Sequence, residues 1–347
     1  MKSFNKYLMH RLRSTFFLTL ILCVLAVIIM EVSVSLYVGT HFEWIEETHE
    51  SYETRMLRIS NFGIVAFILG AACTLMPVVE LGDMKSKRNA DVIYSLPVSR
   101  GKMALAHYLS GLIQIFAIYT SAYVTMYIKV VTSHLYHWVQ SPGALIGCYF
   151  ALLLAGIALY SIIMAIFNSA NTVADGCVFV AVWSFLIGSL FIALSEFNVE
   201  TGDILGIDFI NYLNSEYLYP YSSLSLSEFF YSLIVGARAE TDHINASIFW
   251  IVIGIVCAAV YFFSFKKKRT EELGDLSNTV FGYKVILPVA VFSMTQAFDE
   301  SFLSFIFAIL LGVVGYMIYR RSFKIKKYDL ITIAAITAVT SVAMGVM

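Results

Sequence analysis

Charged residues are scarce in this chain of 347 residues. Asp, Glu, Lys and Arg make up 14% of the sequence, whereas 59% is hydrophobic and the mean hydropathy is +0.78. A soluble domain carries about 25% charged residues. Because apolar runs of about 20 residues also recur along the chain, the composition excludes an ordinary soluble domain. It predicts an all-α, polytopic helical membrane protein.

Motifs for phosphate binding and hydrolysis are absent as well. The chain has no G-x-x-x-x-G-K-[ST], so it does not itself hold ATP phosphates in a P-loop. It also lacks G-x-S-x-G and H-E-x-x-H. His134 and His137 have the spacing of a metal-binding pair, but no third ligand lies near them in the sequence. We interpret the residues around them as a hydrated loop at the membrane interface. We therefore expect no catalytic, cofactor or metal site in this chain, and an intramembrane enzyme is the disfavoured class.

The five cysteines give no sign of a disulfide framework. All of them fall inside apolar runs, and their spacings match no metal or redox motif. They are predicted to be small hydrophobic side chains. The first apolar run, from Phe16, follows several basic residues, but it is too long for a signal peptide and no small-residue cleavage site follows it. We predict a retained first helix.

The apolar runs predict nine helices and three regions. Residues 1–14 form an N-terminal interfacial elbow that lies on the membrane surface. Residues 15–265 hold the first six helices, and residues 196–244 of this region, which are acidic, aromatic and semi-apolar, form an outer re-entrant segment. Residues 266–347 form an inner linker and helices 7–9. The helices are expected at about residues 15–38, 60–81, 103–128, 144–166, 172–195, 246–265, 285–298, 302–319 and 330–347.

The distribution of basic residues orients these helices. With the N-terminus in the cytoplasm, 19 of the 23 lysines and arginines lie in inner segments. The basic residues left in outer loops are Arg55, Arg58, Lys129 and Arg238. Such a bias toward the cytoplasmic side is typical of membrane proteins. It predicts a multi-pass protein of the cell membrane with a cytoplasmic N-terminus.

One ionisable residue, Glu31, lies inside the first predicted helix. A carboxylate within the membrane by default indicates a functional site. The alternative is that Glu31, about five turns along the helix, lies near the outer leaflet and reaches water. The second interpretation is slightly favoured.

A polar, basic segment at residues 83–102 separates the second and third predicted helices. Asn89 is a plausible N-cap for a short helix, and Pro97 ends that helix by disfavouring the α conformation of the residue before it. Val92, Ile93 and Leu96 give the helix an apolar side. Because a simple turn needs only a few residues, we interpret this segment as an element that meets another molecule.

The same segment carries a family resemblance. Paired basic residues, then Asp91, then Tyr-Ser-Leu-Pro-Val-Ser-Arg at 94–100 and Lys102 resemble the region after the second helix of ABC-2 type transporter permeases, the membrane subunits of bacterial ABC exporters. The six-helix order is also similar. Lys266–Arg269 followed by Thr-Glu-Glu-Leu-Gly resembles the stretch after helix 6 in one subgroup. The resemblance covers about residues 1–275, and helices 7–9 go beyond it.

The resemblance implies a six-helix ABC-2 core plus about three extra C-terminal transmembrane helices. It also implies partners: a cytoplasmic ABC ATPase subunit that binds ATP and Mg, a second permease subunit in a homo- or heterodimer, and membrane lipid, with no nucleic acid. The protein would lie in the bacterial plasma membrane. Carried over by position, the coupling loop at 83–102 would dock the ATPase through Arg88, Asn89, Asp91, Tyr94, Leu96, Pro97 and Arg100.

The expected function is that of a permease subunit, which couples ATP hydrolysis by a separate ATPase to substrate export. The alternative is a sensory or signalling membrane protein of the same shape that does not itself move substrate. A flux measurement paired with ATP hydrolysis would separate the two. The sequence leaves the substrate open, and a hydrophobic or amphipathic cargo is compatible with helices rich in Phe, Leu, Ile and Tyr.

Overall fold

A computed structural model describes most of the chain. It covers residues 2–45, 60–132, 139–184, 220–236, 241–268, 281–296 and 302–345, with residues 186, 238, 271, 273–275 and 277. These residues form helices and connecting turns, and none of them lies in a strand, so the all-α prediction is confirmed for this part of the chain. Five of the helices are long and apolar enough to cross a membrane. The chain is therefore an all-α protein with the features of a polytopic membrane protein.

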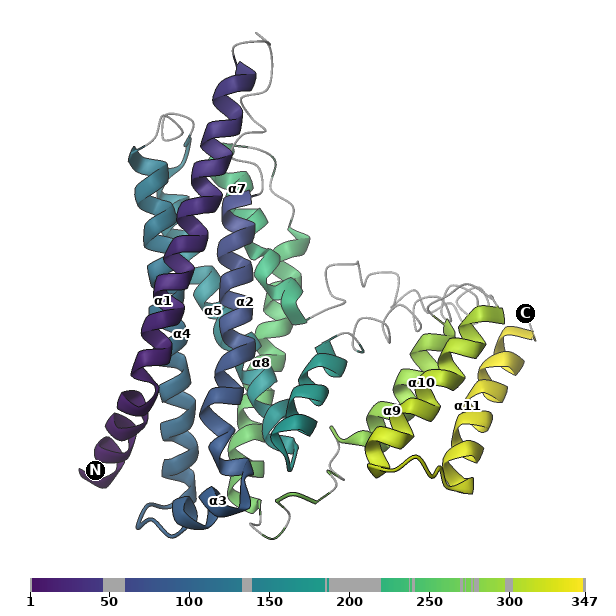
Figure 1. The fold of residues 1–347 in the computed structure, drawn as a ribbon. Helices are drawn as coiled ribbons and strands as arrows, with labels where there is room; N and C mark the ends of the chain where they lie inside the picture. The colour runs from purple at the N-terminus through teal and green to yellow at the C-terminus, as the bar shows by residue number, and fades with distance from the viewer. Residues whose placement is uncertain are drawn as a thin grey trace. The chain divides into compact units, whose positions relative to one another are not determined.

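The described residues divide into two compact units (Figure 1). The first unit comprises Met1–Met84, Arg88–Ala165 and Tyr221–Lys268. Within it, α4 packs against α1, α2 and α8, and Figure 1 shows these long helices running alongside one another. The elements that lie wholly or mostly in this unit are α1 (Lys2–Ile45), α2 (Ser60–Leu81), η2 (Asp83–Lys85), α3 (Lys87–Tyr94), α4 (Arg100–Thr132), α5 (Pro142–Ser169), η5 (Pro220–Ser225), α7 (Leu226–Val235) and α8 (Asp242–Lys267).

Small residues let the helices of the first unit approach closely around α5. A Cβ atom at Gly254 of α8 would lie 2.7 Å from the Cα of Ala158, so this crossing requires glycine. Close contact between small residues is a common way for helices to pack in membranes, where lipid provides no hydrophobic drive toward association. On the opposite side of α5, the Cys73 thiol of α2 donates a hydrogen bond of 3.2 Å to the carbonyl of Gly156.

The second unit comprises Lys85–Lys87, Ile166–Pro220 and Arg269–Met347. Its described helices are a short helix at Val173–Ser184, α9 (Tyr283–Gln296), α10 (Phe302–Arg320) and α11 (Lys327–Gly345). Helices α9, α10 and α11 all pack on one another. They are coloured light green to yellow in Figure 1.

A buried carboxylate organises the start of the Val173–Ser184 helix. The Asp175 backbone N–H donates to Thr172 Oγ1 at 3.1 Å, which is an N-cap bond. The Asp175 side chain, 7% exposed, accepts bonds from Tyr283 at 2.9 Å and Ser277 at 3.3 Å. Arg321 lies 3.4 Å from the same carboxylate. Asp175 thereby joins this helix to the beginning of α9 and the end of α10.

Lys85 caps the C-terminus of α5. Its Nζ donates to the carbonyl oxygens of Phe167 at 2.7 Å and Ala170 at 2.5 Å, and it lies 4.6 Å from the centre of the Phe167 ring. The last carbonyls of a helix carry partial negative charge, so a cation is favourable there. This lysine is only 7% exposed. The polar segment is thus not fully in water, because Lys85 is buried against a helix end.

Apart from the first helix, the helix boundaries predicted from the apolar runs agree with the structure to within a few residues in the described part. Residues 2–14 and the first predicted helix form one continuous helix, α1. Of the predicted re-entrant segment, residues 196–219 lie outside the described residues, and its later part contains η5 and α7. All five cysteines are free thiols, as predicted.

A prediction concerns the turn between α10 and α11. Arg320 donates to both carboxylate oxygens of Asp329, at 2.5 and 2.7 Å, and this lowers the pKa of Asp329. The pair therefore stabilises the turn above about pH 4, the ordinary Asp value, and its contribution is lost as the pH falls through the lowered pKa. At neutral pH, Asp329→Asn should speed hydrogen exchange of the α11 amides roughly tenfold. The exposed Asp275→Asn serves as control, and equal exchange in the two variants would refute the assignment.

Candidate functional site

The predicted short helix of the polar segment is present as α3. It ends at Tyr94, ahead of Pro97, as predicted. It begins at Lys87, so Asn89 lies inside its first turn, and the prediction of Asn89 as N-cap is wrong. The physical reason is that the 3₁₀ turn Asp83–Lys85 leads almost directly into the helix, which therefore starts earlier than the capping residue suggested.

The two faces of α3 differ in exposure. Ala90 is fully buried and Ile93 is half-buried. On the other side, Val92 is 64% exposed, Leu96 just beyond the helix is 39% exposed, and Asp91 is exposed. The apolar residues that the sequence placed on one side therefore separate: Ile93 faces the protein, whereas Val92 and Leu96 remain accessible. An eight-residue helix with two accessible apolar side chains beside an acid can receive a partner.

Arg100 fixes the end of this segment. Its Nη1 donates to the carbonyl oxygens of Lys266 at 3.4 Å and Lys268 at 2.7 Å, at the C-terminus of α8. The guanidinium also lies 5.1 Å from the centre of the Tyr94 ring. Burial raises the pKa of Tyr94, and Arg100 opposes that shift in smaller measure. A cation at the N-terminus of α4 opposes the helix dipole, and the carbonyls of α8 compensate for it here.

Directly before the polar segment, Glu80 of α2 is a buried carboxylate with four donors. The Glu80 side chain has no exposed surface. Its Oε1 accepts bonds from Ser110 at 2.8 Å and Gln114 at 2.6 Å. Its Oε2 accepts from His107 at 3.2 Å and lies 3.4 Å from Arg11 Nη2. We call Glu80 and these four partners the Glu80 network.

Two further side chains of α1 join the Glu80 network. The hydroxyl of Tyr7 lies 2.9 Å from His107 Nε2, and Thr19 donates to Gln114 Oε1 at 3.0 Å. A neutral His107 with its proton on Nδ1 donates to Glu80 and accepts from Tyr7, so one tautomer satisfies both bonds. The network therefore connects α1, α2 and α4.

Arg11 also reaches the first residues of the polar segment. Its Nη2 donates to the Glu80 backbone carbonyl at 2.9 Å, and its Nη1 donates to the Asp83 carboxylate at 3.1 Å. The Asp83 side chain is 59% exposed, in contrast to that of Glu80. Arg11 thus bridges one buried acid and one exposed acid. A displacement of residues 83–85 would therefore move Arg11 and change its contacts with Glu80.

The other sequence-predicted site residues are more peripheral. Arg88 lies in α3, but its side chain is outside the described residues. Asn89 and Pro97 are exposed. The Glu31 carboxylate is half-exposed and forms a 2.5 Å ion pair with Lys129. Lys129 is thus the cationic partner of Glu31, and this pair lies apart from the Glu80 network.

Sequence reasoning missed the Glu80 network. It named Glu31 as the charged candidate and gave Glu80 no role. One signal was available: His107, Ser110 and Gln114 recur at a spacing of three and four residues, which places them on one helical face. A polar stripe in an apolar helix, beside a helix that carries a lone acid, indicates such a network.

Comparisons with family models, with curated proteins and with solved structures found no match to this chain. Among the described residues, no group of three or more His, Cys, Asp or Glu side chains is placed to hold a metal ion. The site joins buried ion pairs to a short, accessible helix.

A stability prediction separates the two acids that Arg11 contacts. Removal of one partner from a buried ion pair leaves an uncompensated charge and costs about 3–5 kcal/mol, whereas an exposed pair contributes about 1 kcal/mol or less. Glu80→Ala should therefore strongly lower the midpoint of thermal unfolding of the purified protein. Asp83→Ala is the matched control and should change it little. Equal midpoints for the two variants would contradict the role of Glu80.

Proposed function

We propose that this chain is the membrane-spanning permease subunit of an ATP-driven ABC exporter. A separate cytoplasmic ATPase subunit would bind ATP and Mg²⁺ and dock on α3, and a second permease subunit would complete the assembly. The observation that carries the proposal is the accessible face of α3, with Val92 at 64% and Leu96 at 39% exposure, on a segment anchored at both ends. The resemblance of residues 94–102 to ABC-2 permeases supports it.

A docking helix transmits force only if it is coupled rigidly to the helices that must move. At its C-terminal end, Arg100 joins the segment to the last carbonyls of α8 and to Tyr94. At its N-terminal end, Arg11 joins Asp83 to Glu80. A displacement of α3 would therefore move α1, α2, α4 and α8 together. Rigid-body displacement of packed helices is a common form of such switching.

The contact set carried over from the family divides by role in this proposal. Asp91, Leu96 and Pro97 are exposed and would touch the ATPase, together with Val92. Arg100 contacts both Tyr94 and the C-terminus of α8, so Arg100 and Tyr94 would position the segment. Loss of a touching residue should weaken ATPase binding. Loss of a positioning residue should leave binding intact but reduce the coupling of hydrolysis to export.

The proposal is tested by asking whether an ABC ATPase subunit encoded beside this chain, or co-expressed with it, co-purifies with it. Val92→Asp should reduce co-purification of that ATPase at least tenfold, because it introduces a charge into an apolar contact. Phe323→Asp, at a residue that is 91% exposed between α10 and α11, is the matched control and should not reduce it. The proposal fails if no ATPase co-purifies with the wild-type chain, or if Val92→Asp binds as well as Phe323→Asp.

Coupling is measured separately in proteoliposomes. Arg100→Ala should retain the ATPase but lose export per ATP hydrolysed. Arg100→Lys, which keeps the charge but cannot reproduce the same planar contact with Tyr94, should show an intermediate loss. Normal export by Arg100→Ala would exclude the positioning role. Substrate-stimulated hydrolysis without flux in the wild-type complex would instead identify a signalling protein.

A further inference from the structure

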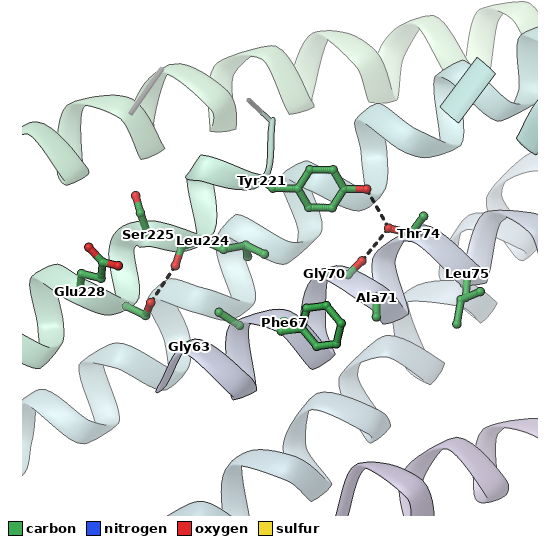
Figure 2. A pocket seen from close by; sticks show the side chains of 12 residues that line it. Gly63, Phe67, Gly70, Ala71, Thr74, Leu75, Tyr221, Leu224, Ser225 and Glu228 are labelled. Atoms are coloured by element: carbon green, nitrogen blue, oxygen red, sulfur yellow. Dashed lines mark hydrogen bonds between the residues drawn. The ribbon is translucent and has the colours of Figure 1, made fainter. Parts of the chain in front are cut away.

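A groove on the first unit lies apart from the Glu80 network. It runs between the first half of α2 and the segment formed by η5 and α7, with a volume of about 640 Å³ (Figure 2). Small side chains form its floor: Gly63, Ala66, Gly70 and Ala71 all lie on α2. From Gly63 to Leu75, the α2 side is about 18 Å long at a rise of 1.5 Å per residue.

The walls of the groove are apolar along most of its length. Phe67 is 72% exposed and Leu75 is 49% exposed, while Leu224 is buried in the opposite wall. At one end, the hydroxyls of Thr74 and Tyr221 lie 3.0 Å apart, and Thr74 donates to the Gly70 carbonyl at 2.7 Å. These hydroxyls are therefore already engaged by the protein. An alkyl chain matches such a lining.

The other end of the groove carries a carboxylate. Figure 2 shows Glu228 of α7 at the end of the groove where Gly63 lies, opposite the end that holds Thr74 and Tyr221. The Glu228 side chain is 67% exposed, and in the described part of the chain it lies 3.8 Å from His243 Nε2. That distance is beyond hydrogen-bonding range. The Glu228 oxygens thus retain capacity to accept a hydrogen bond from a second cation.

We propose that this groove binds a single-chain amphipath with a cationic head, drawn from the membrane. The alkyl chain lies along Gly63–Leu75 and an ammonium group meets Glu228. The groove has one charged side chain in its lining, and that side chain is an acid at one end, so it favours ammonium over neutral or anionic heads of equal chain length. A hydrogen bond to a charged group makes this preference about tenfold. The inference does not depend on an ATPase partner.

The test uses the purified full chain in nanodiscs of phosphatidylcholine and an alkylammonium probe with a photoreactive group on its chain. Cross-linked peptides are mapped by mass spectrometry. Dodecylammonium, dodecanol and dodecanoate then compete with the probe. Saturable labelling of residues 63–75 and 221–228, with dodecylammonium about tenfold stronger than dodecanol, is the expected result. Equal competition by the three compounds, or labelling spread along the other apolar helices, would overturn the proposal.

Two pairs of variants locate the site. Glu228→Gln should abolish the preference for ammonium, whereas Glu31→Gln, at another half-exposed carboxylate, should preserve it. Gly63→Leu should block labelling at the groove. A Cβ at Gly63 meets nothing within 4 Å, as at Gly143, so Gly143→Leu is the control for a glycine replaced in open space. Unchanged preference in Glu228→Gln would assign binding to the apolar surface alone and exclude the proposed site.

Discussion

The burial of Glu80 is the constraint on which the arrangement of α1, α2 and α4 depends. A carboxylate without access to water must find its hydrogen-bond donors inside the protein, since the desolvation cost is otherwise several kcal/mol. Glu80 has four such donors, three from one face of α4 and one from α1. Rotation of α4 by one residue, about 100°, would turn His107, Ser110 and Gln114 away from Glu80 at the same time. The network therefore sets the register of these helices more strictly than apolar packing could.

The same solution recurs at Asp175, but in a different setting. Glu80 is satisfied by side chains of neighbouring helices, whereas Asp175 lies in the first turn of a helix whose N-cap is Thr172. The helix dipole favours an acid at that position. Each unit thus contains a buried acid that gathers otherwise separate elements. Since polar contacts have strict geometry, both units gain specificity that their apolar surfaces alone would not give.

The sequence predicted the helices well because their signal is local. The length of each apolar run gave the boundaries, and Pro97 stopped α3 where a proline should. Long-range pairs were not predictable in the same way. Glu80 meets partners 27 to 69 residues away, and hydropathy along one dimension does not say which polar residues share an interface. Lys85 illustrates this: it belongs to a polar stretch interpreted as meeting another molecule, yet the carbonyls of Phe167 and Ala170 hold it in a buried position.

The order of synthesis gives the Arg11 contact a further consequence. Arg11 leaves the ribosome 69 residues before Glu80, and His107 and Gln114 follow later still. The first helix must therefore enter the bilayer while the anchor that will hold it does not yet exist. Its attachment to the rest of the first unit can be completed only after α4 has been inserted. Until then α1 lies in lipid without contacts to α4. Its long apolar surface is compatible with lipid in that state.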